Sequence, residues 1–316
     1  IKIDNEDSYY QKLEIELDNG QREIIEHGKE NLVQEKNKFN DGDKIIVYNN
    51  GNNIYQVVDR WRLDGYWYIL LFFLLIVLYF VGVRGVAAVF GLFYSLLIIF
   101  LVMVPMLLHG FNPILATIIS GLVIVIPTTF ITHGFKKQSF LISASIVGGL
   151  LVALILNIIF TYLTRLTGAG SEETYYLQIA GFGNVDFKAL FMGGVIVGVL
   201  GVLDDVAVGQ ISVVNEIREV DSKISNVELT MRSLRVGKAH VLSLVNTLAL
   251  AYIGAALPLF MLFVGDKSMP WWVLLNSEGI GEEIIRTLVG SSALILTVPI
   301  ATLLAVWFKD KKSSYR

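Results

Sequence analysis

The chain has 316 residues, of which 54% are hydrophobic and only 17% are charged, so it is too apolar to form a single water-soluble core. Its net charge of −3 argues against a nucleic-acid-binding protein, which needs a clustered basic surface. The absence of cysteine excludes disulfides, thiolate metal sites and cysteine nucleophiles.

Short strands separated by strong turns predict a small all-β domain in residues 1–62. Apolar and acidic residues alternate over 13–17, which is the period of a strand. Asn19-Gly20 follows and favours a tight hairpin turn, because both residues tolerate positive φ. Further strands are expected at 44–48 and 54–58, and together they predict a small barrel or sandwich.

Long apolar runs follow and predict an α-helical, polytopic membrane bundle of about seven spans in residues 63–316. Each run approaches the roughly 20 apolar residues that a helix needs to cross a bilayer, so the lipid bilayer is a predicted partner. The expected spans are 67–83, 86–108, 113–132, 138–161, 188–208, 240–264 and 284–308.

The charges in the loops predict how the chain is oriented. Basic residues gather in alternate loops and in the tail, at Arg84, Lys136, Lys137, Arg218, Lys223, Arg232, Arg235, Lys238, Lys309, Lys311, Lys312 and Arg316. The positive-inside rule therefore places the C-terminus in the cytoplasm and the β domain outside. Because an outside domain must be translocated, we expect a signal peptide or a further membrane helix ahead of Ile1.

The cytoplasmic segment at about 210–238 carries apolar residues at alternating spacings of four and three. We interpret it as an amphipathic helix lying against the membrane or the bundle, with a partner-binding coiled coil as the alternative. Ser225-Asn-Val-Glu228 fits a capping box, so two short helices joined by a turn are a further alternative.

Two adjacent aspartates, Asp204 and Asp205, lie near the end of the fifth span. Ionised carboxylates are costly in hydrocarbon, so by default they mark a functional site. At about 100° per residue, Gly194, Gly198 and Gly201 fall on the same face of the helix as Asp205. Since glycines at this spacing allow close helix packing, we predict that Asp205 points into the bundle and Asp204 points away from it.

The sixth span begins at the same depth with His240, Ser243, Asn246 and Thr247. An aspartate, a histidine and hydroxyl or amide groups at one level form a candidate proton-carrying or cation-coordinating site. The alternative is that Asp205 only hydrogen-bonds a neighbouring helix and fixes the fold. Asn246 also has a second interpretation, in which it and Asn157 are buried amides joining helices.

On the outer side, Glu282, Glu283 and Arg286 have the spacings of ion pairs within one helix. We interpret them as an outer-side surface ion pair rather than as a binding site.

Several motifs resemble the YibE/F family of multi-pass membrane proteins. The resemblance rests on Gly201-Val-Leu-Asp-Asp-Val-Ala207, Val236-Gly-Lys-Ala-His240, the segment Asn246 to Pro258, and the segment Glu283 to Pro299. It extends over nearly the whole chain. The resemblance implies a bacterial cytoplasmic (inner) membrane protein of a family treated as permeases without an assigned substrate.

The sequence offers no catalytic constellation. An intramembrane aspartyl protease needs two carboxylates from different helices, whereas Asp204 and Asp205 are neighbours on one helix. Zinc-binding histidine patterns, phosphate-binding loops and nucleophile elbows are missing. We therefore predict a protein that is not an enzyme and that carries no metal or cofactor.

We expect a permease for a small solute or ion, coupled to a proton or cation through Asp205, with Asp204, His240 and Asn246 in support. The alternative is a non-transporting scaffold or accessory subunit whose β domain and cytoplasmic helix bind a protein partner or form a homo-oligomer. In a transporter, a polar, water-accessible cavity should reach Asp205. In a scaffold, protein should seal that carboxylate.

Overall fold

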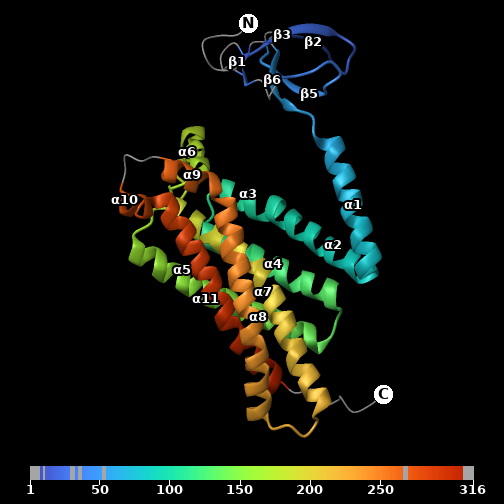
Figure 1. The fold of residues 1–316 in the computed structure, drawn as a ribbon, viewed down its shortest axis with the longest axis vertical. Helices are drawn as coiled ribbons and strands as arrows, with labels where there is room; N and C mark the ends of the chain where they lie inside the picture. Colours follow the sequence, from blue (N-terminus) through green and yellow to red (C-terminus); the bar gives the residue numbers. More distant parts are fainter. Residues whose placement is uncertain are drawn as a thin grey trace. The chain divides into compact units, whose positions relative to one another are not determined.

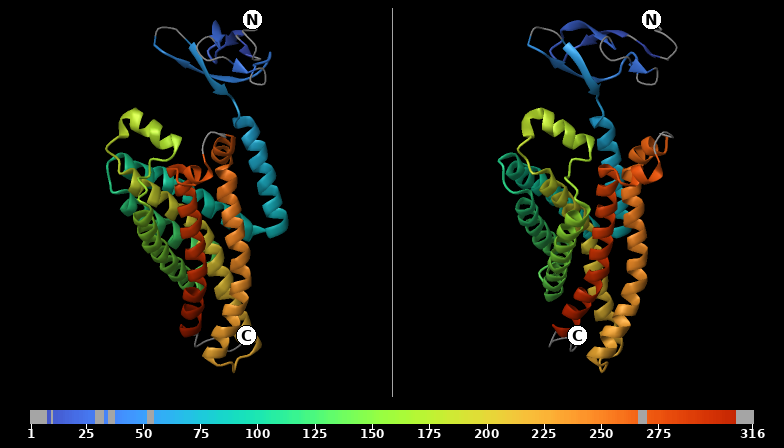
Figure 2. Two further views of the ribbon diagram at one scale, coloured as in Figure 1. Left: turned by 60° about the vertical axis from the view of Figure 1, so that its left-hand side comes forward. Right: turned by 90° about the vertical axis from the view of Figure 1, so that its left-hand side faces the viewer.

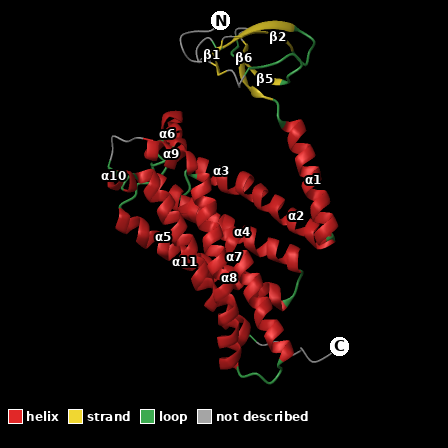
Figure 3. Ribbon diagram, viewed as in Figure 1, coloured by secondary structure: helices red, strands yellow, loops and turns green. Residues whose placement is uncertain are grey.

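The computed structural model describes residues 8–9, 11–28, 33–34, 38–51, 55–265 and 270–308. The contacts divide the chain into two compact units, Ile1–Gly82 and Val83–Arg316. In the described chain, strands occur only near the N-terminus, and the other elements are helices joined by loops and turns (Figures 1 and 3). The basic tail at 309–316, which contributed to the predicted orientation, lies outside the described residues.

The predicted β region is present as antiparallel hairpins. The six strands are β1 (Ser8–Tyr9), β2 (Gln11–Glu16), β3 (Arg22–His27), β4 (Val33–Gln34), β5 (Ile45–Asn49) and β6 (Tyr55–Arg60). They form three separate antiparallel pairs, β1 with β4, β2 with β3, and β5 with β6. The turn after β2 contains the predicted Asn19-Gly20, and Gly20 has a φ of 81° there. Residue 54, at the start of one predicted strand, lies outside the described residues.

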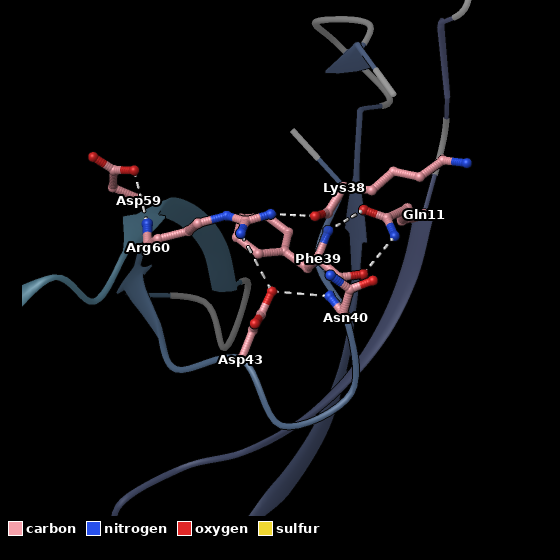
Figure 4. Close-up of polar contacts among 7 residues, drawn as sticks. All are labelled: Gln11, Lys38, Phe39, Asn40, Asp43, Asp59 and Arg60. Carbon is pink, nitrogen blue, oxygen red and sulfur yellow. Dashed lines mark hydrogen bonds and ion pairs between the residues drawn. The ribbon is translucent and has the colours of Figure 1, made fainter. Parts of the chain in front are cut away.

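A short segment around Phe39 ties the two main hairpins together through polar and ring contacts (Figure 4). Gln11 of β2 exchanges two hydrogen bonds of 3.0 Å with the backbone of Phe39. The Arg60 guanidinium of β6 lies 4.9 Å from the centre of the Phe39 ring and forms an ion pair of 3.6 Å with Asp43. The hairpins are thus joined by side chains and not by a continuous sheet.

Helix α1 (Leu63–Val81) begins directly after β6 and belongs to the same unit. Its Asp64 pairs with Lys44 at 2.8 Å and accepts a hydrogen bond from the Trp61 indole. Just before the helix, a hydrogen bond from Arg62 lowers the pKa of Asp59. The end of the β region and the start of α1 are therefore linked by short-range charge pairs.

The described elements of the second unit are all helices. Its elements are α2 (Val83–Ile98), the π-helical segment η2 (Ile99–Met103), α3 (Val104–Leu108), α4 (Pro113–His133), α5 (Lys137–Thr164), α6 (Glu172–Leu177), the π-helical segment η3 (Gln178–Phe182), α7 (Phe187–Val220), α8 (Asn226–Ala255), α9 (Leu257–Gly265), α10 (Trp271–Leu275) and α11 (Glu278–Trp307).

Among the described residues, seven helices are long and apolar enough to cross a membrane, which indicates a multi-pass membrane protein. They are α1, the continuous run Gly85–Leu108, α4, α5, α7, α8 and α11. The sixth span was predicted with the wrong limits, because α8 starts at Asn226 and ends at Ala255. Pro258, the second residue of α9, has no N–H to continue the hydrogen-bond ladder of α8.

The core of the second unit lies between α5, α7, α8 and α11, with α4 against α7 and α2 against α4. Helices α7, α8 and α11 run side by side in both views of Figure 2. Fully buried apolar side chains of α7 include Val195, Val199, Leu203 and Ile211. Apolar packing of this kind fixes the rotation of α7, and with it the direction of its polar residues.

The segment 210–238 is not a separate amphipathic helix. Instead, α7 continues to Val220 and α8 begins at Asn226. The Ser225 hydroxyl accepts a hydrogen bond of 3.2 Å from the Glu228 backbone, as the capping pattern indicated. The alternative of two helices joined by a turn was therefore correct. The two helices are not short, however, because each continues an apolar span. The apolar period continues across the turn because both helix ends pack on the same core.

Candidate functional site

Helix α7 carries Asp204 and Asp205 without interruption. Asp186 caps its start by accepting a hydrogen bond of 3.0 Å from the Ala189 backbone. The rise of 1.5 Å per residue puts Asp205 about 28 Å along the axis from this cap. Since the hydrocarbon core of a bilayer is about 30 Å thick, Asp205 lies close to one of its boundaries if α7 spans a membrane.

The inward direction predicted for Asp205 is wrong. Its side chain is exposed on the surface of the described chain, whereas that of Asp204 is partly buried. The side of α7 that faces the bundle is formed by Val195, Val199 and Leu203, which are fully buried. These residues bury more apolar area than glycines can, and they turn Asp205 to the opposite side.

The glycines that share this side of α7 are not closely packed as predicted. Gly194, Gly198 and Gly201 are all exposed. A Cβ on Gly194 or Gly201 would meet no atom within 4 Å. Gly198 is the exception, since its Cβ would lie 2.8 Å from the Tyr252 hydroxyl. The close helix contacts use other glycines, such as Gly193, where a Cβ would lie 2.5 Å from the Thr117 hydroxyl.

Helix α8 contributes polar side chains beside Asp205. His240, Ser243, Asn246 and Thr247 are all exposed, so the buried-amide interpretation of Asn246 is wrong. A Cβ on Gly209 of α7 would lie 3.4 Å from the His240 ring, which shows that His240 borders α7. At about 100° per residue, Ser243 and Thr247 lie on the His240 side of α8 and Asn246 is turned away.

We call the resulting surface the α7–α8 polar face, formed by Gly194, Gly198, Gly201, Asp205, His240, Ser243 and Thr247. The contacts of Gly198 with Tyr252 and of Gly209 with His240 set the antiparallel register of the two helices. This register puts Asp205 about one turn from His240. Within the described part of the chain, Asp205 makes no hydrogen bond or ion pair, so its carboxylate is available to water, an ion or a partner.

The residues predicted to lie on the outer side form two different contacts. Glu283 and Arg286 form the predicted ion pair, with 3.5 Å between their charged atoms. Glu282 is only 5% exposed and accepts a hydrogen bond of 2.9 Å from the Gly170 backbone, so its predicted surface position is wrong. The loop 167–170 approaches α11 closely enough to bury this carboxylate.

Arg286 lies between two aromatic rings, with its guanidinium 5.9 Å from the centres of the Phe191 and Tyr252 rings. The Tyr252 hydroxyl and the Arg286 Nε are buried and have no hydrogen-bond partner among the described residues. Glu283 also lines a small cavity of about 210 Å³ together with residues of α8, α9 and α11. Asp205 is not among the residues that line this cavity, so it is not the polar cavity expected at Asp205 in a transporter.

Gln210 is a buried polar residue that the sequence did not single out as a contact. Its side-chain amide donates hydrogen bonds to the Ser233 carbonyl at 3.0 Å and to the Thr302 hydroxyl at 2.7 Å, so it joins α7, α8 and α11. A glutamine in a largely apolar helix, five residues after Asp205, was the available signal. Asn157 was correctly interpreted as an amide joining helices, because it donates to the Met192 carbonyl at 2.9 Å.

In the described residues, no group of three or more histidine, aspartate or glutamate side chains could hold a metal ion. The chemistry available at the α7–α8 polar face is therefore that of one free carboxylate, one imidazole and two hydroxyls. Such groups exchange protons or bind a small cation transiently.

Seven apolar helices and a polar face on two of them define a multi-pass membrane protein of the helical-bundle type. The family described as YibE/F-like protein matches residues 69–311, and the chain belongs to this family, as its motifs indicated. The match begins within α1 and leaves out the β strands. The comparisons with curated proteins and with solved structures gave no match for this chain.

Proposed function

We propose that the protein is a permease that moves a small solute or ion and is coupled to a proton or cation at Asp205. The observation that carries the proposal is the exposed Asp205 carboxylate, which has no partner among the described residues and lies on one face with His240. An ionised carboxylate on a spanning helix is costly against lipid. Water or a translocated cation beside it would remove that cost.

The proposal includes a location and an orientation. The protein would lie in the bacterial cytoplasmic membrane, with the β region outside and the turn between α7 and α8 in the cytoplasm. Basic residues of this turn and its flanks, including Lys223 and Arg235, support this orientation through the positive-inside rule. Asp205 would then lie near the cytoplasmic boundary, where a proton or cation can be released to the cytosol.

A second candidate function is that of a scaffold, in which the seal expected over Asp205 would have to come from another chain, because no described residue of this chain provides it. The described residues leave Asp205 uncovered. A membrane helix of a protein partner or of a second copy could therefore cover the carboxylate in place of water or a cation. In a scaffold, the carboxylate would fix an assembly and would not carry a substrate.

Flux measurements with the full chain in liposomes distinguish the two functions. Proton, Na⁺ and K⁺ fluxes are measured after an imposed gradient, followed by a panel of small metabolites. We expect a flux that Asp205→Asn abolishes and that Asp205→Glu largely retains, because the glutamate keeps an ionisable carboxyl. Asp204→Asn is the matched control and should retain more flux, since Asp204 lies off the polar face.

Two results would refute the permease. One is an absence of flux for every probe by a folded wild-type protein. The other is an Asp205→Asn variant that transports like the wild type. If Asp205→Asn instead changes the oligomeric state or the co-purifying partners without affecting any flux, the scaffold is favoured.

A further inference from the structure

The β region contains the hairpins β2–β3 and β5–β6. Among the described residues, one edge of β2 and one edge of β5 pair with no other strand. The Leu17 backbone N–H donates a hydrogen bond of 2.9 Å to the Gln21 carbonyl. Together with the register of β2 and β3, this bond shows which residues of β2 form hydrogen-bonded pairs with β3. In an antiparallel pair, every second residue directs its backbone groups toward the partner strand. The backbone N–H and C=O groups of Ile15 therefore point toward β3, whereas those of Lys12, Glu14 and Glu16 point away from it. Among the described residues, no other strand pairs with this edge of β2.

A cleft of about 1170 Å³ lies along this edge and along β5. It is lined by every residue from Lys12 to Asp18 and from Phe39 to Val47, together with Trp61 and Asp64, whereas β3 contributes only Arg22 and β6 contributes none. A cleft over the face of a strand would touch alternate residues, because side chains alternate between faces. Contact with consecutive residues places this cleft at the strand edges. Since β3 contacts β6, the cleft is the gap in an incomplete barrel.

We propose that this cleft binds an extended, basic polypeptide segment, which adds a strand between β2 and β5. Open strand edges pair readily with another chain, and the main-chain hydrogen bonds supply affinity. The free backbone groups of β2 at Lys12, Glu14 and Glu16 would form one ladder with the inserted strand. The edge of β5 would form the second.

Charge determines which kind of segment fits. The residues that line the cleft include six acidic side chains, Glu14, Glu16, Asp18, Asp41, Asp43 and Asp64, and three basic ones, Lys12, Arg22 and Lys44. Six negative and three positive lining charges leave an excess of three negative charges. Because Asp43 also pairs with Arg60, which lies outside the lining, two of them remain. Lysine or arginine residues on the bound strand would therefore be attracted, and acidic ones would be repelled.

Side-chain alternation further limits the partner. Ile15 is 8% exposed and points into the β region, whereas its neighbours Glu14 and Glu16 are exposed. A strand laid beside β2 repeats this alternation. The expected ligand thus has apolar residues on the inward side and basic residues on the outward side, in strict alternation.

The test uses the full chain in a neutral detergent and a fluorescent peptide of alternating lysine and valine. Glu14→Pro removes the outward N–H and leaves the β2–β3 ladder intact, because proline is tolerated on an edge strand when its N–H would face outward. Glu14→Ala is the matched control, since it loses the same charge and keeps the N–H. Amide exchange of Ile25 in β3 reports whether both variants retain the hairpin.

We expect the peptide to bind the wild type and to bind Glu14→Pro about tenfold more weakly than Glu14→Ala, as expected for one lost backbone hydrogen bond. A glutamate–valine peptide should bind more weakly than the lysine–valine peptide, and a version with proline at alternate positions should not bind. Equal binding to both Glu14 variants would overturn strand addition, and equal binding of the acidic peptide would overturn the choice of a basic ligand. Amides at 12, 14 and 16 that are already protected without peptide would also overturn the proposal, because the edge would then be covered.

Discussion

At the scale of single residues, Gln210 joins three helices through one side chain. Its amide bonds to the Ser233 carbonyl and the Thr302 hydroxyl. Hydrogen bonds between membrane helices contribute on average about 0.6 kcal/mol and at most about 1.7 kcal/mol. We predict that Gln210→Leu lowers the free energy of unfolding by an amount in this range, measured by thermal or denaturant unfolding in bicelles. Ser212→Ala is the control, since among the described residues the Ser212 hydroxyl donates only to the Val208 carbonyl of its own helix.

Gly237 gives an independent check of the same contact. A Cβ at this position would lie 2.2 Å from the Gln210 side-chain oxygen. Gly237→Ala should therefore destabilise the protein in the wild-type background and less so in Gln210→Ala, which removes this contact and leaves the contact of 2.7 Å with Val298. If the two substitutions are additive, the contact between α7 and α8 at Gln210 is not as the structure has it.

At the scale of elements, two adjacent glycines of α7 have opposite environments. A Cβ on Gly193 would lie 2.5 Å from the Thr117 hydroxyl of α4, whereas one on Gly194 would meet nothing within 4 Å. We predict that Gly193→Ala destabilises the bundle by about 1–3 kcal/mol through overpacking. Gly194→Ala should be neutral or stabilising by up to about 1 kcal/mol, because alanine has the higher helix propensity. Unfolding measurements on both variants under the same conditions check this difference.

Helix α7 also shows which structural features could be predicted from the sequence and which could not. Hydropathy identified the apolar helices, because a run of about 20 apolar residues is typical of a membrane-spanning helix and of few other structures. It could not set the rotation of α7, since both the Gly194–Asp205 side and the Val195–Leu203 side repeat with helical period. Which of these sides is buried depends on how three other helices, α5, α8 and α11, pack against α7. Gln210 was missed for the same reason, because its partners are in two other helices.

At the scale of the whole molecule, the two proposed surfaces belong to different units. The cleft lies in the unit Ile1–Gly82, and the α7–α8 polar face lies in the unit Val83–Arg316. The family match covers the helical unit and leaves out the β strands. Transport at Asp205 and strand binding in the cleft can therefore be tested separately, and either proposal can fail without the other.

The orientation is a property of the whole chain, and the absence of cysteine makes it directly measurable. Asn50 lies in the β region and Ser222 in the turn between α7 and α8, and both are exposed. We predict that a membrane-impermeant maleimide labels Asn50→Cys on spheroplasts, because the positive-inside rule puts the β region outside. Ser222→Cys should be labelled only after the membrane is permeabilised. The wild type should remain unlabelled under both conditions. Labelling of Ser222→Cys on intact spheroplasts would reverse the orientation and would put Asp205 near the outer boundary, where it could not release a cation to the cytosol.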